Sequence, residues 1–386
     1  MSAVAVRTLI ISDLHLGSLS GADVLRRAEL RAPLLEALAD VDRLVLLGDV
    51  LELRQGPLRD AMAAARPFFE DLGRALGEGD LVMVAGNHDH ALIEPWLARR
   101  GEQGEPPPLE VEQILGPAEA SPMLEQIAEW ASPARVSVAY PGLWLRPDVY
   151  ATHGHYLDCH LTVPTLERLS MGLMSRVLGR RPEAFADVDD YEAVGSPAFA
   201  WRDAVARSGR TGRLLNGTTT DGAWRALRSD ASRRGQGAGA RLRRRALMAA
   251  FPLVVAALNR AGLGPLCADI SSGELRRAGL QAMGQVATRL DLGDAYVVFG
   301  HTHRAGPLPG DRAVEWRAGG AAGALGSGAR LVNTGCWTYA RVFLTSTPGE
   351  SPYWPGTCVL VEDTGPPVLK RMLLDRSLAE LSPPPA

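Results

Sequence analysis

The sequence predicts an α/β fold in which a parallel or mixed sheet carries functional groups at the ends of its strands. Apolar segments typical of buried strands recur at residues 7–12, 43–47, 80–85, 148–152 and 294–299. Helical spacing of apolar residues fills 22–39 and 57–76, between the first three strands. Each strand leads directly into a turn that contains Asp, Asn or His, and folds of this class bind their ligands at the carboxyl ends of strands.

The remaining segments predict a core that a helical insertion interrupts. A short helix is expected near 122–131, and alternation on both sides of Pro141–Gly142 predicts a hairpin. Further strands are expected at 331–333, 357–361 and 368–374. Between 160 and 288 the strand signals vanish, and the sequence is helix-like and rich in Ala and Arg. We therefore expect a first core part (1–159), a helical cap insertion (160–288) and a second core part (289–380).

Composition argues against several classes of protein. The net charge of −3 disfavours a general nucleic-acid binder, because such proteins usually carry a basic excess. The four cysteines are far apart and form no Cys-x-x-Cys motif, a pattern typical of reduced thiols in a cytoplasmic protein. The longest apolar run, 246–258, has 13 residues, whereas a membrane span needs roughly 20. No basic and apolar leader precedes the first strand, so we expect a cytoplasmic location.

Histidine is concentrated in the turns that follow the strands. Six of the eight histidines lie there: His15, His88, His153, His155, His301 and His303. Asp13, Asp49 and Asn87 occupy equivalent positions after their strands. Any one of these histidines could be a core or loop residue with satisfied hydrogen bonds, but a random spread would not place six of them in these turns. The set therefore predicts a metal site.

The predicted ligands, a mixture of histidine imidazoles and Asp or Asn oxygens, are numerous enough to bind a pair of divalent ions. Two ions about 3.5–4 Å apart need a bridging anion, and Asp49 is placed to supply it. A mixed nitrogen and oxygen set favours manganese, iron, zinc or cobalt over magnesium or calcium, and manganese is our first expectation. A hydroxide between two such ions has a lowered pKa and can attack phosphorus in line, while the cations neutralise charge on the phosphoryl oxygens.

Five short motifs resemble the signatures of the calcineurin-like metallophosphoesterase superfamily. In chain order they are Asp13-x-His15, Gly48-Asp49-x-x-Glu52, Gly86-Asn87-His88-Asp89, Thr152-His153-Gly154-His155 and Gly300-His301-Thr302-His303. The resemblance covers residues 1–159 and 289–375 but not the insertion. It implies a four-layer α/β/β/α sandwich and a hydrolase of phosphoester or pyrophosphate bonds.

The resemblance also implies roles for individual residues. A first metal ion would be held by Asp13, His15, Asp49 and His303, and a second by Asp49, Asn87, His153 and His301. His88 resembles the family's catalytic histidine, which contacts the phosphate and assists the leaving group. Glu52 stands where the family usually has Asp, and we expect it to orient His88. His155, Asp158, His90 and Asp89 could belong to the site, or could support it from behind or lie at the surface, and the supporting or surface role is favoured for all but His155. Arg304 could contact substrate phosphate or be a solvated charge.

The cap carries a basic run directly before the apolar run 246–258. Its arginines are Arg225, Arg228, Arg233, Arg234, Arg241, Arg243, Arg244 and Arg245, and only Asp230 opposes them. A solvated basic face is the favoured interpretation; the alternatives are steering of an anionic substrate and contact with anionic lipid. The apolar run suits an interfacial helix, but a helix buried against the core is favoured. The cap is therefore the candidate for a peripheral contact with the inner face of the membrane.

Several short sequence segments are similar to those of the bacterial UDP-2,3-diacylglucosamine pyrophosphohydrolase branch of the superfamily. They are Asp13–Gly17, Gly48–Leu53, Gly300–Arg304 and Asn333–Gly335. That branch has a helical cap that holds acyl chains, but it commonly has Arg where this chain has His88, and the present insertion is longer. The expected partner is a phosphorylated small molecule or a lipid-linked pyrophosphate. A non-catalytic scaffold on the same fold is a further alternative, which the complete set of seven ligands disfavours.

Overall fold

A computed structural model describes residues 6–102, 106–207, 238–318 and 328–383. Within them, ten strands form one curled sheet in the order β10-β9-β1-β2-β3-β5-β6-β7-β8, with β4 paired to β5 off this path. The strands are β1 Thr8–Ile11, β2 Arg43–Leu47, β3 Asp80–Val84, β4 Glu112–Leu115, β5 Arg135–Arg146, β6 Val149–Thr152, β7 Tyr296–Phe299, β8 Arg330–Asn333, β9 Thr357–Val361 and β10 Val368–Arg371. β1 to β3 are parallel to one another, as are β6 to β8.

β5 and β6 connect these two parallel groups. The first part of β5 pairs in parallel with β3, with Ala139 opposite Val84. Its later part pairs antiparallel with β6, with Gly142 opposite Thr152. Because β6 runs back toward the end of β3, the carboxyl ends of β1, β2, β3, β6 and β7 meet at one edge of the molecule.

The predicted hairpin is wrong, because β5 runs without interruption through Pro141 and Gly142. Gly142 marks a close approach and not a turn: a Cβ there would lie 2.4 Å from the carbonyl oxygen of Ala151 and from the hydroxyl of Tyr150. Pro141 lies at an irregularity in the pairing with β4, where a residue without an N–H is tolerated. The chain reverses between the ends of β5 and β6, at residues 147–148.

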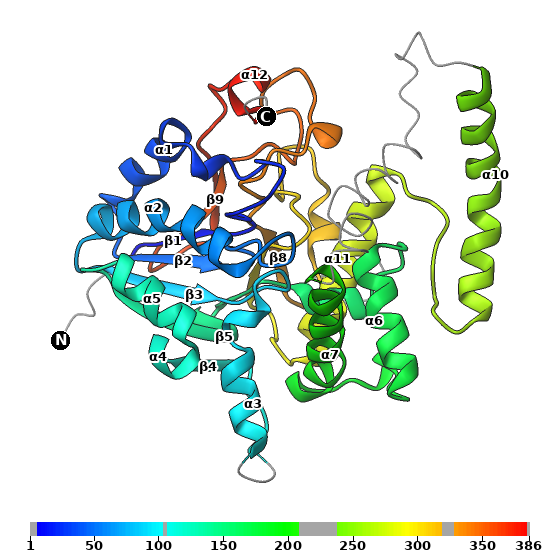
Figure 1. The fold of residues 1–386 in the computed structure, drawn as a ribbon, viewed down its shortest axis with the longest axis horizontal. Helices are drawn as coiled ribbons and strands as arrows, with labels where there is room; N and C mark the ends of the chain where they lie inside the picture. Colours follow the sequence, from blue (N-terminus) through cyan, green and yellow to red (C-terminus); the bar gives the residue numbers. More distant parts are fainter. Residues whose placement is uncertain (1–5, 103–105, 208–237, 319–327, 384–386) are drawn as a thin grey trace.

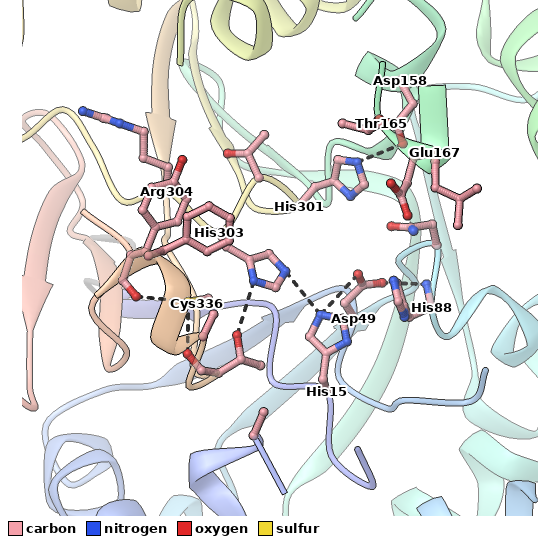
Figure 2. A pocket seen from close by; sticks show the side chains of 18 of the residues that line it. His15, Asp49, His88, Asp158, Thr165, Glu167, His301, His303, Arg304 and Cys336 are labelled. Carbon is pink, nitrogen blue, oxygen red and sulfur yellow. Dashed lines mark hydrogen bonds and ion pairs between the residues drawn. The ribbon is translucent and has the colours of Figure 1, made fainter. Parts of the chain in front are cut away.

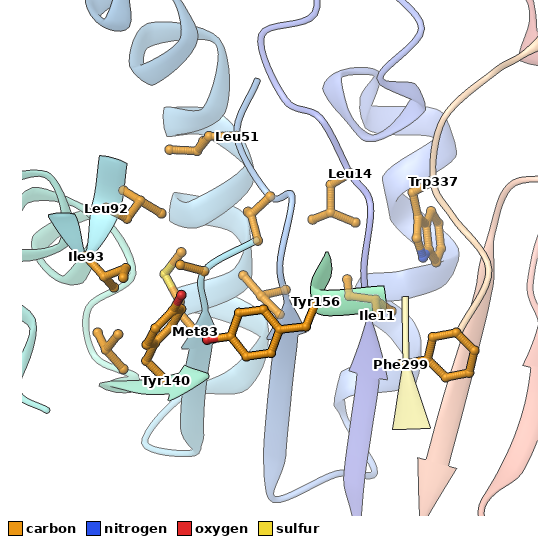
Figure 3. Close-up of a cluster of buried hydrophobic side chains, with 14 of the residues drawn as sticks. Ile11, Leu14, Leu51, Met83, Leu92, Ile93, Tyr140, Tyr156, Phe299 and Trp337 are labelled. Carbon is orange, nitrogen blue, oxygen red and sulfur yellow. The ribbon is translucent and has the colours of Figure 1, made fainter. Parts of the chain in front are cut away.

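Alternating side chains of the strands build two apolar cores, and this produces four layers. Side chains on one face meet in an inner cluster: Ile10, Val45, Leu47, Val82, Val84, Ala139, Leu143, Val149, Ala151, Val298, Val332, Val359 and Val361. Both parallel groups contribute to it, so the two halves of the curled sheet pack face to face. The opposite faces pack against helices and loops, as the cluster around Ile11, Met83 and Phe299 shows (Figure 3). The fold is therefore the predicted α/β/β/α sandwich.

Helices cover the outer faces of the two halves. α1 (Ala28–Leu38) and α2 (Leu58–Leu76) lie over β1 to β3 with α5 (Pro122–Trp130) beside them, and α11 (Ser272–Arg289) lies beside β8 (Figure 1). α1 and α2 continue through Pro33 and Pro67. α3 (Glu94–Glu102), α4 (Pro117–Ala120), α12 (Leu378–Leu381) and β4 lie outside the predicted elements. Short 3₁₀ helices are η1 Val24–Arg26, η2 His90–Leu92, η3 His155–Cys159, η4 Pro182–Ala184, η5 Ala313–Trp316 and η7 Arg341–Phe343.

The described part of the insertion is helical. α6 (Leu166–Val177) and α7 (Val188–Arg207) pack against each other and against η3. α10 (Ala238–Arg260) lies at the edge of the molecule (Figure 1), although Val255 on it is buried. Four arginines of the predicted basic run lie outside the described residues: Arg225, Arg228, Arg233 and Arg234. The side chains of Arg241, Arg243, Arg244 and Arg245 lie outside them as well. Among the described residues, no helix combines the length and apolarity needed to cross a membrane.

Candidate metal centre

Loops at one edge of the sheet bring the predicted ligands together. The ligands follow the strands as a set: Asp13 and His15 after β1, Asp49 after β2, Asn87 after β3, His153 after β6, and His301 and His303 after β7. Backbone hydrogen bonds join these loops directly. The N–H of His15 donates to the carbonyl of Asp49 at 2.9 Å, and the N–H of Gly300 donates to that of His153 at 3.0 Å. Loops from both ends of the sequence therefore lie side by side at this edge of the sheet.

The backbone is strained at five of the seven predicted ligands. These residues have positive φ: Asp13 (56°), His15 (47°), Asp49 (51°), His301 (65°) and His303 (58°). Left-handed backbone costs a non-glycine residue about 1–3 kcal/mol and persists only where the surroundings impose it. Its concentration at these positions indicates that the fold holds the side chains in a particular geometry.

Two glycines in the motifs allow the loops to approach closely. A Cβ at Gly48 would lie 2.4 Å from the ring of His153, and one at Gly86 would lie 2.3 Å from Oδ1 of Asp49. Each glycine therefore leaves room for a ligand from another loop.

The first ligand group consists of Asp13, His15 and His303, whose ligand atoms lie within 4.8 Å of one another. His303 Nε2 is 3.2 Å from Asp13 Oδ1. It also lies 3.3 Å from His15 Nε2 (Figure 2). His15 Nδ1 donates to the Glu52 carboxylate at 3.2 Å, so the neutral ring keeps its lone pair on Nε2, which faces the group.

The second ligand group consists of Asp49, His153 and His301. His153 Nδ1 donates to the carbonyl oxygen of Leu47 at 2.9 Å, which leaves the lone pair of the neutral ring on Nε2. This Nε2 lies 3.4 Å from Asp49 Oδ2 and 3.2 Å from Asn87 Oδ1. Nitrogen and oxygen lone pairs therefore converge on one point.

Asp49 lies between the two groups. Its Oδ2 is 3.7 Å from His15 Nε2 and 3.4 Å from His153 Nε2. Its Oδ1 accepts a hydrogen bond of 2.8 Å from the backbone N–H of His88, which fixes the carboxylate. One oxygen thus faces both groups, which is the arrangement that a bridging ligand requires.

Asp158 supports the second group, a role that the sequence left open. It is almost fully buried in η3, and its Oδ2 lies 2.9 Å from His301 Nε2 (Figure 2). A carboxylate that accepts from one ring nitrogen leaves the other free for a metal ion. No local pattern signals this contact, because the two residues are 143 positions apart.

His88 and Glu52 lie beside the two groups, and together with His15 they form a third set of potential ligand atoms within 4.8 Å of one another. Both Glu52 oxygens lie close to His88 Nδ1, at 3.1 and 2.9 Å, and Gln55 Nε2 donates to the same carboxylate at 3.1 Å. Burial alone would raise the pKa of Glu52, but His88 and His15 hold this pKa well below its usual range. The ionised carboxylate therefore accepts the His88 Nδ1 proton, and His88 Nε2 is the nitrogen available to the cavity. Burial lowers the pKa of His88, and Glu52 offsets this only in part.

A carboxylate in each ligand group raises the pKa of a neighbouring histidine. Burial acts to lower the pKa of His153, but Asp49 outweighs it and raises the pKa to about 9. Asp13 likewise outweighs burial at His303, whose pKa lies well above its ordinary value. Positive charge is therefore stabilised at both groups.

The donor set fits divalent cations. Asp13 Oδ1 is buried without a hydrogen-bond partner, although it faces His303 Nε2. His15 and His153 each bond to the protein through Nδ1, so their Nε2 atoms point toward carboxylate oxygens that cannot donate. Two cations, one per group and sharing Asp49, would satisfy these atoms.

The remaining candidate residues lie outside both groups. Asp89 accepts hydrogen bonds from the backbone of Gly86 (2.6 Å) and Val50 (2.7 Å), and so ties together the loops after β2 and β3. His155 is buried against the ring of His153, and neither of its ring nitrogens has a partner. His90 Nε2 lies 3.5 Å from the Glu192 carboxylate. None of the three lies in the cavity beside the ligands.

Arg304 lines the cavity and is not a solvated charge. Its guanidinium meets Asp311 through two hydrogen bonds, of 2.7 and 3.1 Å, and lies 5.4 Å from the ring of Trp316. Its charge is thus already paired.

A cavity of about 760 Å³ extends under the cap, and five of the seven predicted ligands line it: His15, Asp49, Asn87, His301 and His303. Apolar side chains form much of its wall: Leu161, Leu166, Trp201, Leu275, Leu280, Trp316, Phe343 and Tyr353. Charged wall residues include Arg54, Glu167, Arg202, Arg276 and Arg341. The cavity is large enough for a phosphate at the ligand groups with a bulky organic group beside it.

Comparison with known proteins agrees with this geometry. Residues 6–190 match the family model of the calcineurin-like phosphoesterases. The match includes the loops after β1, β2, β3 and β6, and it extends through α6 into the first residues of α7. A search of curated proteins finds no matching relative.

Proposed function

Because the chain belongs to the calcineurin-like phosphoesterase family, whose members are phosphoester hydrolases, we propose that it cleaves a phosphoester or pyrophosphate bond with two divalent metal ions. One observation carries the proposal: Asp49 Oδ2 lies 3.7 Å from His15 and 3.4 Å from His153, between two groups of ligand atoms.

The seven predicted ligands divide between the two ions. Asp13, His15 and His303 would hold the first, Asn87, His153 and His301 the second, and Asp49 both. When bound, the two ions would lower the pKa of an attacking water and neutralise charge on the phosphoryl oxygens. The mixed donor set favours manganese, with iron, zinc or cobalt as alternatives.

His88 would act on the substrate from beside the ligands. Glu52 fixes its ring through Nδ1, and the ring lines the cavity with Nε2 available. A phosphate in the cavity would favour the protonated ring, which can then donate from Nε2 to the leaving oxygen. Glu52 is thus a positioning residue for both His88 and His15.

The test is hydrolysis by the purified protein with added Mn²⁺. The panel is p-nitrophenyl phosphate, bis-p-nitrophenyl phosphate and nucleotide-sugar diphosphates, which separates monoesters, diesters and pyrophosphates. We expect turnover of at least one class and its loss with a chelator. No turnover of any class, with no metal retained by the protein, would favour the non-catalytic scaffold.

A second candidate is hydrolysis of a lipid-linked pyrophosphate at a membrane surface. Two features favour it: the apolar cavity wall beside the ligand groups, and α10, on which Leu253 is 72% and Val254 52% exposed. Residues 231–268 of the sequence, which include α10, contain seven Arg and no Asp or Glu. Exposed apolar side chains in a basic segment are suited to the surface of an anionic bilayer.

Vesicle pelleting tests this candidate. The protein should pellet with phosphatidylglycerol vesicles and not with phosphatidylcholine vesicles, and a Leu253→Ser, Val254→Ser double variant should stay in the supernatant. Ile114→Ser is the matched control. Ile114 is also apolar and 57% exposed, but it belongs to strand β4 of the sheet and not to the cap. Equal pelleting of the double variant and the wild type would exclude α10 as the contact.

A further inference from the structure

One face of the cap helix α7 is directed at the loops that carry the predicted metal ligands. Glu192, Ser196, Phe199 and Asp203 are spaced by four, three and four residues, so they lie on one side of the helix. Each of them contacts a residue of the core or a neighbour in this row. We call these four residues the α7 stripe.

Glu192 is the centre of a buried polar cluster. The hydroxyl groups of Tyr156 (2.5 Å), Tyr140 and Ser196 all donate to its carboxylate. His90 Nε2 lies 3.5 Å from the same carboxylate. Burial would raise the pKa of Glu192, but His90, Ser196 and Tyr140 lower it to about 2. A buried anion is therefore maintained by groups from the cap, from strand β5 and from two core loops.

Phe199 and Asp203 extend these contacts along the stripe. The Phe199 ring lies 5.0 Å from that of His90 and 5.3 Å from that of His155. Asp203 Oδ1 accepts a hydrogen bond of 3.0 Å from Nε of Arg54, which follows the Glu52 loop. The stripe thus touches the chain beside three of the motifs.

Two of the contacted loops carry ligands of the second group. His90 is three residues after Asn87, and Tyr156 is three residues after His153. Asn87 Oδ1 and His153 Nε2 lie 3.2 Å apart, and both belong on one ion in the proposed function. The loops of Asn87 and His153 therefore have to keep a fixed separation. Glu192 contacts both of these loops, through His90 and Tyr156.

We propose that Glu192 is a positioning residue of the metal centre, and that α7 holds the loops of Asn87 and His153 at the spacing that the second metal ion requires. The cap insertion would then support metal binding in addition to enclosing the substrate. This inference rests on the proposed two-metal function. It goes beyond that function, because neither the motifs nor the ligand groups include any residue of α7.

The experiment measures Mn²⁺ binding to metal-free protein by calorimetry, with no substrate present. Glu192→Gln keeps the size of the side chain but removes its charge and replaces one acceptor oxygen by an amide donor. Tyr140 and Tyr156 share one oxygen, so Ser196 and His90 would lose the other, which they now face. We expect one of two binding steps to weaken about 10–100-fold and the other to stay unchanged. Asp190→Asn is the matched control: Asp190 lies on the same helix, and its charge pairs with Arg180 within the cap.

Two further measurements separate positioning from general destabilisation. The melting temperature with chelator reports the fold without metal, and Phe199→Leu perturbs the stripe without changing charge. We expect Phe199→Leu to weaken the same binding step by a smaller factor. Equal loss at both steps, or two unchanged steps in both variants, would overturn the inference while leaving the proposed function intact. A wild type that binds no Mn²⁺ would instead overturn the proposed function.

Discussion

The loops of the core and the helices of the cap contribute to the site in different ways. The loops hold five ligands at positive φ, fixed by backbone hydrogen bonds and by buried partners such as Glu52 and Asp158. The cap helices have ordinary helical backbone, and their side chains line the cavity and pack behind the ligand loops. Changes in the loops should therefore abolish the chemistry, whereas changes in the cap should alter binding.

Removing Asp49 should have the largest effect. Asp49→Ala takes away the carboxylate that faces both ligand groups, so neither ion would be held correctly. We expect activity to fall by more than about 10³-fold, together with the loss of at least one metal ion. Turnover and metal content on the same sample provide the check, and an active variant that keeps both ions would refute the shared-ligand assignment.

Replacing His88 should separate chemistry from metal binding. His88→Ala removes the ring that lines the cavity but none of the seven ligands. The turnover number should fall about 10²–10⁴-fold while two ions remain bound. If metal is lost with the ring, His88 serves the site by holding its structure and not by proton transfer.

Asp158→Asn tests whether Asp158, on the η3 helix that packs against the cap, orients the predicted metal ligand His301. The amide oxygen is a weaker hydrogen-bond acceptor than a carboxylate oxygen, so the ring of His301 would be oriented less firmly. We expect metal affinity to fall about 10–100-fold, with no change in the melting temperature of the chelated protein. Unaltered affinity would mean that His301 is fixed by other contacts.

The pH dependence of metal binding follows from His153. Its folded pKa of about 9 lies above the value of about 6.5 expected in the unfolded chain, so the metal-free fold binds this proton more tightly. This contribution to stability is full below pH 6.5 and is lost as the pH rises through about 9. Because metal displaces the same proton, Mn²⁺ affinity should rise up to tenfold per pH unit in this interval for each proton released.

Melting curves and binding isotherms between pH 6 and pH 9.5 would check this. The chelated protein should lose stability toward the alkaline end, whereas the Mn²⁺-loaded protein should not. An affinity that is independent of pH would show that His153 does not have to release a proton.

A change in the cavity wall should have the smallest effect. Trp201 of α7 lines the cavity and touches no ligand group in the described residues. For Trp201→Ala we expect KM to rise a few-fold, up to about tenfold, with kcat unchanged. Val177→Ala on α6 is the control, because Val177 is 70% exposed and lies outside the cavity. A fall in kcat would instead link the wall to the chemistry.

The strands and the candidate ligands could be predicted because each is marked by a short pattern of neighbouring residues in the sequence. β2 and β9 have the predicted bounds, and each ligand stands within a few residues of an apolar strand. The course of β5 could not be predicted, because Pro141–Gly142 has the composition of a turn. Only the tertiary structure shows that Gly142 makes room for Tyr150 and Ala151 of β6.

The supporting residues of the site could not be predicted for a similar reason. Asp158 acts on His301, far along the chain, and its surroundings in the sequence contain no motif for that contact. Glu192 stands near Asp189 and Asp190 in a polar helical segment, where a solvated carboxylate is the usual expectation. Its burial becomes visible only once β5 and η3 place Tyr140 and Tyr156 beside it.

Anomalous diffraction at the manganese edge, from crystals grown with Mn²⁺, tests the central claim most directly. Two peaks are predicted, about 3.5–4 Å apart and on either side of Asp49. One should contact Asp13, His15 and His303, and the other Asn87, His153 and His301. A single peak, or peaks that do not share Asp49, would contradict the account.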